Sequence, residues 1–182
     1  SSPKRFARNF LCQVLGQVEG VEVPYFVSVE ELCKMVEKAK DSVREAFSEI
    51  LSVLTSSRPQ KQKIIQEVFA LPAHMARALS RKVVLLFDNF ENIFNLKSYP
   101  ELKKLEKLLA ETLSSQTEVS YAISGTKSVR LGKLFKKSGF WSRKFARIHL
   151  SPLSREDTYY LASSIFGEEK RPVPRDVLPT IH

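Results

Sequence analysis

Residues 82–91 of the chain are KVVLLFDNFE, in which an uninterrupted apolar run is followed at once by Asp88. An apolar run of this length without alternation is typical of a strand in a parallel sheet that is covered on both faces. Such sheets bind ligands at the carboxyl ends of their strands. Asp88 therefore stands where a carboxylate can hold a hydrated magnesium ion beside a phosphate. The alternative is an ordinary helix-cap or turn Asp that follows a buried strand.

A second apolar run, residues 119–124, predicts a neighbouring strand that ends in small hydroxyl residues. Ser124 closes this strand and Thr126 follows two residues later. A hydroxyl at the end of a strand beside Asp88 can sense a terminal phosphate. The competing interpretation is a plain helix cap by Ser124 or Thr126.

The rest of the chain alternates helical and extended patterns. The spacing of apolar residues predicts helices over 6–18, 30–54, 61–79, 101–114, 128–137 and 155–166, and strands over 21–29, 83–87, 119–124 and 146–150. Pro72 is a potential interruption of the third helix, and Ser154 with Asp157 forms a capping-box-like start for the last one. The alternation predicts an α/β fold with a parallel sheet flanked by helices.

Composition limits the class of protein. A chain of 182 residues with 43% hydrophobic residues can bury the core of one ordinary domain. No apolar run approaches the roughly 18 residues of a membrane span, and the N-terminal segment lacks the apolar region of a signal peptide. Two cysteines without CxxC spacing indicate reduced thiols. We therefore expect a cytoplasmic protein without a membrane partner.

The formal charge of +9 is concentrated in residues 119–155, which contain no acidic residue. This region carries Lys127, Arg130, Lys133, Lys136, Lys137, Arg143, Lys144, Arg147 and Arg155. Aromatic residues are interleaved with them: Phe135, Phe140, Trp141 and Phe145. Such a face could bind a phosphate backbone and stack bases, with the cations of residues 127–137 and Lys144 as the candidate contacts. The alternative is a helix that packs its apolar side and turns its lysines to water.

Three segments of the chain together resemble a known family. In order they are VVLLFDNFENIF (83–94), YAISGTKSVRLGKLF (121–135) and SGFWSRKFARIHLSPLSREDTYYLASSIF (138–166). They are similar to the Walker B, sensor 1 and following segments of the archaeal ATPase family, within the AAA+ and STAND group of P-loop NTPases. The resemblance in sequence covers residues 81–166. The N-terminal third of the chain resembles the family only in the order of its secondary-structure elements. It implies an AAA+-like nucleotide-binding core over residues 1–150 and the start of a helical lid over residues 151–182.

The resemblance also implies roles for individual residues. Asp88 corresponds to the magnesium-coordinating Asp, and Ser124 and Thr126 to the sensor 1 polar group. Arg143 lies where an arginine finger would stand, although it could equally be one more member of a solvated basic face. The implied function is to bind ATP with Mg²⁺ and to use its hydrolysis to switch conformation or assembly, which allows a homo-oligomer.

Two departures from the family pattern bear on activity. Asn89 occupies the position of the Glu that polarises the attacking water, and an amide cannot accept a proton, so Glu91 is the nearest carboxylate. The sequence also contains no GxxxxGK[ST] phosphate-binding loop. Ser1 and Ser2 could be the remnant of a truncated loop, or the loop could be missing altogether. The alternative function is a degenerate, non-hydrolysing AAA+-like module whose basic 127–155 face binds nucleic acid or a protein partner.

Overall fold

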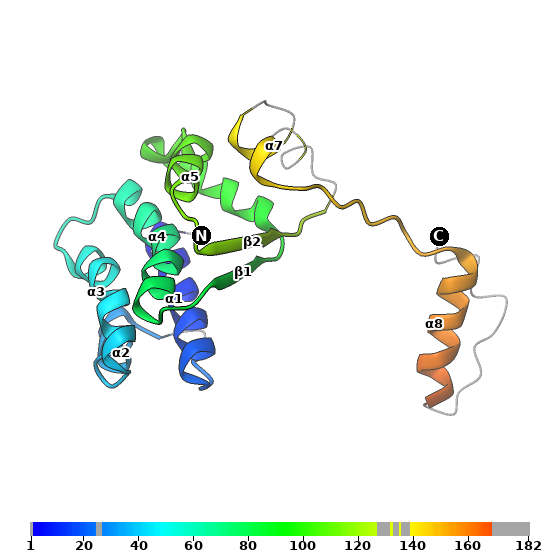
Figure 1. The fold of residues 1–182 in the computed structure, drawn as a ribbon, viewed down its shortest axis with the longest axis horizontal. Helices are drawn as coiled ribbons and strands as arrows, with labels where there is room; N and C mark the ends of the chain where they lie inside the picture. The colour runs from blue at the N-terminus through cyan, green and yellow to red at the C-terminus, as the bar shows by residue number, and fades with distance from the viewer. Residues whose placement is uncertain (1, 25–26, 127–131, 133–134, 136–138, 169–182) are drawn as a thin grey trace. The chain divides into compact units, whose positions relative to one another are not determined.

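The computed structural model describes residues 2–24, 27–126, 132, 135 and 139–168, and the chain divides into two compact units, Ser1–Phe145 and Ala146–His182 (Figure 1). The first unit has a mixed α/β fold that is mostly helical. Its helices are α1 (Pro3–Glu19), α2 (Val29–Glu37), α3 (Asp41–Thr55), α4 (Lys61–Ala78), α5 (Leu105–Ser114) and α7 (Phe140–Lys144), with 3-10 segments η1 (Phe90–Ser98) and η2 (Pro100–Leu102). The strands β1 (Val83–Phe87) and β2 (Val119–Ile123) form a two-stranded parallel sheet.

Helix α4 is the centre of the first unit, where it packs against α1, α3, α5 and both strands (Figure 1). Ile65, Val68 and Phe69 of this helix are completely buried. Pro72 lies inside α4 without ending it, although proline removes one intrahelical hydrogen bond. Burial of an apolar side chain of this size stabilises a fold by about 1.5–3 kcal/mol, which outweighs that loss when several such chains pack together.

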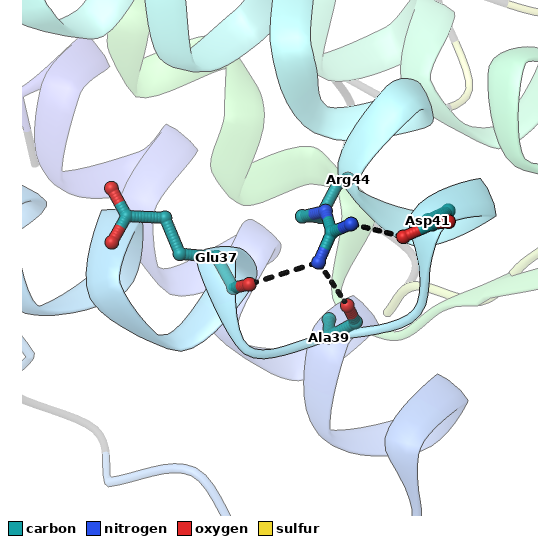
Figure 2. Close-up of polar contacts among 4 residues, drawn as sticks. All are labelled: Glu37, Ala39, Asp41 and Arg44. Atoms are coloured by element: carbon teal, nitrogen blue, oxygen red, sulfur yellow. Dashed lines mark hydrogen bonds and ion pairs between the residues drawn. The ribbon is translucent and has the colours of Figure 1, made fainter.

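The predicted helix over residues 30–54 is wrong in one respect, because the chain breaks between α2 and α3. No glycine or proline marks this break in the sequence. Figure 2 shows how Arg44 stabilises it: its Nη1 donates to the carbonyl oxygens of Glu37 at 3.1 Å and Ala39 at 3.2 Å. The same guanidinium pairs with Asp41. Arg44 thus satisfies the Glu37 carbonyl, which the end of α2 leaves without an intrahelical partner, and the Ala39 carbonyl in the connection to α3.

The predicted strand over residues 21–29 is also wrong. Among residues 21–28, those that the structure describes (21–24, 27 and 28) have no regular secondary structure, and α2 begins at Val29. Ser28 and Glu31 form a reciprocal capping box, in which each side chain accepts a hydrogen bond from the other residue's backbone amide. This local motif starts a helix at Val29, and the β-branched residues before it do not form a strand.

The described part of the chain covers one face of the sheet only, which corrects the expectation of a strand buried on both faces. Val83, Leu85 and Phe87 point toward the core, whereas Val84 and Leu86 are 67% and 74% exposed. Ser120 and Ala122, the register partners of Val84 and Leu86, are exposed as well. The strands pair in parallel as predicted, so their carboxyl ends meet at one edge.

The second unit contains α8 (Arg155–Glu168). The Ser154 hydroxyl accepts a hydrogen bond from the Asp157 amide at 3.0 Å and donates to the Asp157 carboxylate at 2.6 Å, which confirms the predicted helix start. The predicted strand over 146–150 is wrong, since none of the described residues forms a ladder with this segment. Across the described part of both units, no helix has the length and apolar character needed to cross a membrane.

Candidate functional site

The site forms around a turn that joins β1 to η1. The Ser124 amide donates to the Phe87 carbonyl at 2.7 Å, and the Ser124 carbonyl accepts from the Phe90 amide at 3.1 Å. These two bonds continue the parallel pairing beyond the last strand residues on each side. Asp88 and Asn89 lie between the two bonded positions and are both exposed. The backbone therefore presents this dipeptide at the carboxyl edge of the sheet.

Aromatic packing anchors both ends of the turn. The Phe87 ring lies 5.4 Å from that of Phe90, and it also contacts Phe69 of α4 at 5.5 Å and Phe10 of α1 at 6.0 Å. Phe90 is buried and contacts Trp141 of α7 at 6.1 Å. Aromatic pairs of this kind contribute about 0.5–1.5 kcal/mol beyond their buried area. The exposed dipeptide is thus attached on both sides to the rigid core.

The Asp88 carboxylate accepts hydrogen bonds from two neighbouring residues. Its Oδ1 accepts from the Asn89 amide at 2.9 Å and from the Ser124 hydroxyl. Its Oδ2 accepts from Nδ2 of Asn89 at 3.1 Å. These donors are all neutral, so the carboxylate is oriented while its negative charge remains uncompensated by any of them.

Glu91 is held by Thr126, the second hydroxyl residue that follows β2. Its Oε1 accepts from the Thr126 hydroxyl at 2.8 Å and from the Thr126 amide at 3.2 Å. Its own backbone amide and the Thr126 hydroxyl hold the pKa of Glu91 below its usual value, against the opposing effects of burial and the negative charge of Asp88. The other oxygen, Oε2, is closed off from solvent and has no hydrogen-bond partner among the described residues.

The oxygen donors at this edge fit a hydrated magnesium ion. An ionised carboxylate has about four acceptor positions, and the three hydrogen bonds to Asp88 leave one available. Magnesium is commonly held by one or two carboxylates together with waters and substrate phosphates. No group of three or more His, Cys, Asp or Glu residues in the described part of the chain could form a complete protein cage. The site therefore suits an ion that keeps most of its water.

Arg143 is not joined to this cluster in the described structure. It lies exposed near the end of α7, and no described residue forms a hydrogen bond or ion pair with its guanidinium. Lys144 is exposed beside it. The remaining candidate nucleic-acid contacts lie outside the described residues: Lys127, Arg130, Lys133, Lys136 and Lys137. The arginine-finger and nucleic-acid roles stay predictions.

The aromatic residues of the basic region pack on one another. Trp141 is 5% exposed, and its ring contacts Phe140 at 5.3 Å and Phe145 at 5.6 Å. Phe135 contacts Phe145 at 6.1 Å. Trp141 is therefore not available for base stacking in this conformation, whereas Phe135, Phe140 and Phe145 are only partly buried.

Comparison with protein-family models, with curated proteins and with solved structures found no match to this chain. The fold and the site define a mixed α/β protein with a carboxylate and hydroxyl cluster at the edge of a parallel sheet. Its assignment to a class of nucleotide-binding proteins remains a prediction from the sequence motifs.

Proposed function

We propose that this chain is the magnesium-dependent ATP-binding core of an AAA+/STAND-type NTPase similar to the archaeal ATPases, and that it acts as a nucleotide-dependent conformational or assembly switch. One observation supports this most directly. Asp88, Glu91, Ser124 and Thr126 come together at the carboxyl ends of two adjacent parallel strands, and open parallel sheets bind their ligands at that edge.

In this proposal Asp88 holds the hydrated ion through its remaining acceptor position. When bound, Mg²⁺ neutralises charge on the phosphates of a nucleotide. Arg143 serves as a candidate second cation from α7, since a guanidinium keeps its proton beside phosphate oxygens. The nucleotide phosphates would have to be held without a GxxxxGK[ST] loop in residues 1–182.

The geometry favours binding over rapid hydrolysis. Asn89 cannot accept a proton, and its Nδ2 already donates to Asp88. Glu91 has one oxygen bonded to Thr126 and the other closed off from solvent. A general base must reach the water that it activates, either directly or through one further water. We therefore expect slow ATP turnover by this chain even where ATP binds.

Isothermal titration of the full chain with ATPγS, with and without Mg²⁺, tests the proposal. We expect binding that depends on Mg²⁺, and we expect Asp88→Asn to weaken it by about tenfold or more, equivalent to about 1.4 kcal/mol. The amide of this variant keeps the shape and one hydrogen-bonding oxygen but removes the charge that attracts the ion.

Glu101→Gln is the matched control, because Glu101 is a carboxylate of η2 that pairs with Lys61 at 2.6 Å rather than with the cluster. It should bind ATPγS like the unmodified chain. Binding of ATPγS that is indifferent to Mg²⁺, or an Asp88→Asn variant with unchanged affinity, would show that this edge of the sheet is not the magnesium site.

A further inference from the structure

We infer that Ser124 and Thr126 are positioning residues for the carboxylates of Asp88 and Glu91, and that neither hydroxyl is a direct ligand of the nucleotide. The inference rests on the proposed function for the magnesium role of Asp88. It changes the role that the sequence motifs implied, in which these hydroxyls sense a terminal phosphate.

All three polar groups of Ser124 form hydrogen bonds with the turn that contains Asp88. Its amide donates to the Phe87 carbonyl and its carbonyl accepts from the Phe90 amide. Its backbone is therefore bonded on both sides of Asp88 and Asn89. Its hydroxyl donates to Oδ1 of Asp88. These three bonds determine both where the turn lies and how the carboxylate is rotated.

Thr126 performs the same task for Glu91. Its amide and its hydroxyl both donate to one oxygen, Oε1, at 3.2 Å and 2.8 Å. The pair joins η1 to the segment after β2, across 35 positions of sequence. Asp88 and Glu91 are thus held by hydroxyl residues that lie two positions apart on the same strand end.

The chemistry of a hydroxyl group separates the two possible roles. Ser and Thr hydroxyls each have a single proton to donate, and ionised phosphate oxygens only accept. A hydroxyl that donates to a carboxylate must therefore give up that bond before it can donate to a phosphate. Each of these bonds has an ionised acceptor, and such charge-assisted hydrogen bonds are stronger than those between neutral groups. Retention of the carboxylate bonds is the favoured arrangement.

Residues that orient a metal ligand have a characteristic effect. Removing such a partner weakens metal affinity by about 10- to 100-fold although the ligand itself remains. A phosphate-binding hydroxyl behaves differently, since its loss weakens nucleotide affinity at saturating Mg²⁺. The two roles can therefore be separated by measuring the two affinities independently.

The test measures Mg²⁺ affinity of the full chain by competition with Mn²⁺, followed by electron paramagnetic resonance, and ATPγS affinity at saturating Mg²⁺. We expect Ser124→Ala to weaken Mg²⁺ binding by about tenfold and to change ATPγS affinity by less than about twofold. Ser124→Thr keeps the hydroxyl and should restore Mg²⁺ affinity. Ser120→Ala is the matched control, since Ser120 is an exposed serine of β2, the strand that Ser124 follows.

Circular dichroism confirms that each variant folds. Weaker ATPγS binding by Ser124→Ala at saturating Mg²⁺, with Mg²⁺ affinity unchanged, would overturn the inference and leave the proposed function standing. Absence of both Mg²⁺ binding and Mg²⁺-dependent ATPγS binding by the unmodified chain would instead overturn the proposed function.

A second measurement needs neither ion nor nucleotide. Amide hydrogen exchange at Thr126 should become faster in Glu91→Ala, because the carboxylate that accepts from this amide is gone. It should remain slow in Glu101→Ala. Unchanged exchange at Thr126 in Glu91→Ala would overturn the pairing on which its positioning role depends.

Discussion

Asn89 adopts a left-handed backbone conformation, with φ 49° and ψ 45°. This conformation costs most residues about 1–2 kcal/mol, and Asn is one of the few that tolerate it. The Asn89 side chain also donates to the Asp88 carboxylate, where a Glu would add a second negative charge. The backbone of the turn therefore provides a physical reason for an amide rather than a carboxylate at Asn89.

Substitution of Asn89 tests this explanation at the scale of one residue. Asn89→Ala should lower the free energy of unfolding by about 1 kcal/mol, because Ala tolerates the left-handed conformation poorly and loses the contact with Asp88. Asn89→Gly loses the same contact but has no steric penalty, so it should be the more stable of the two variants. Urea denaturation followed by circular dichroism measures the difference. Equal stability of the two variants would argue against backbone strain at this position.

At the scale of elements, the break between α2 and α3 depends on one side chain. Arg44 donates to two carbonyl oxygens and pairs with Asp41 (Figure 2). Asp41 is 92% exposed, so the ion pair itself contributes little. The contacts with the carbonyls of Glu37 and Ala39 are the ones that stabilise the change of direction, because they satisfy the end of a helix.

Arg44→Ala should therefore lower the free energy of unfolding by about 1 kcal/mol. Asp41→Asn should lower it much less, since it removes the exposed ion pair and leaves the carbonyl contacts in place. Thermal and urea unfolding of both variants, compared with the unmodified chain, measures the two effects. If Asp41→Asn destabilised the chain as much as Arg44→Ala, the ion pair rather than the carbonyl contacts would be the stabilising feature.

At the scale of the whole first unit, a buried amide joins elements that are distant in sequence. Gln116 is 4% exposed and follows α5. Its Nε2 donates to the Phe69 carbonyl of α4 at 2.7 Å, and its Oε1 accepts from the hydroxyl of Tyr121 in β2. Burial raises the pKa of Tyr121 well above its ordinary value, so the phenol keeps the proton that it donates.

Replacing Gln116 with Leu should lower the free energy of unfolding by about 2–3 kcal/mol, because it leaves the Phe69 carbonyl and the Tyr121 hydroxyl buried without this partner. Tyr121→Phe removes only one of these hydrogen bonds and should cost about half as much. Chemical denaturation monitored by the fluorescence of Trp141 provides the measurement. A Gln116→Leu variant as stable as the unmodified chain would contradict the importance of this link.

Much of the fold and of the site could be predicted from local patterns. The apolar runs of β1 and β2 predicted two parallel strands, and the periodic spacing in α1 and α4 predicted two helices. The same patterns singled out Asp88 and Ser124 as residues that follow strands. These predictions succeeded because hydrophobic periodicity indicates which side chains are buried, and polar residues directly after an apolar run indicate where a strand ends.

Three features were decided only by the tertiary structure. These are the break before α3, the exposure of Val84 and Leu86, and the pairing of hydroxyls with carboxylates. The break before α3 depends on contacts of Arg44 with carbonyls only seven and five positions away. The bonds of Ser124 to Asp88 and of Thr126 to Glu91 instead join groups that meet across the fold, 36 and 35 positions apart.

The sequence by itself determined which residues stand at the edge of the sheet, because hydrophobic periodicity is a local property of the chain. Only the tertiary structure decided which acceptor each hydroxyl donates to. A hydrogen bond needs its two atoms within about 3 Å, and the packing of β1 against β2 brings those atoms together.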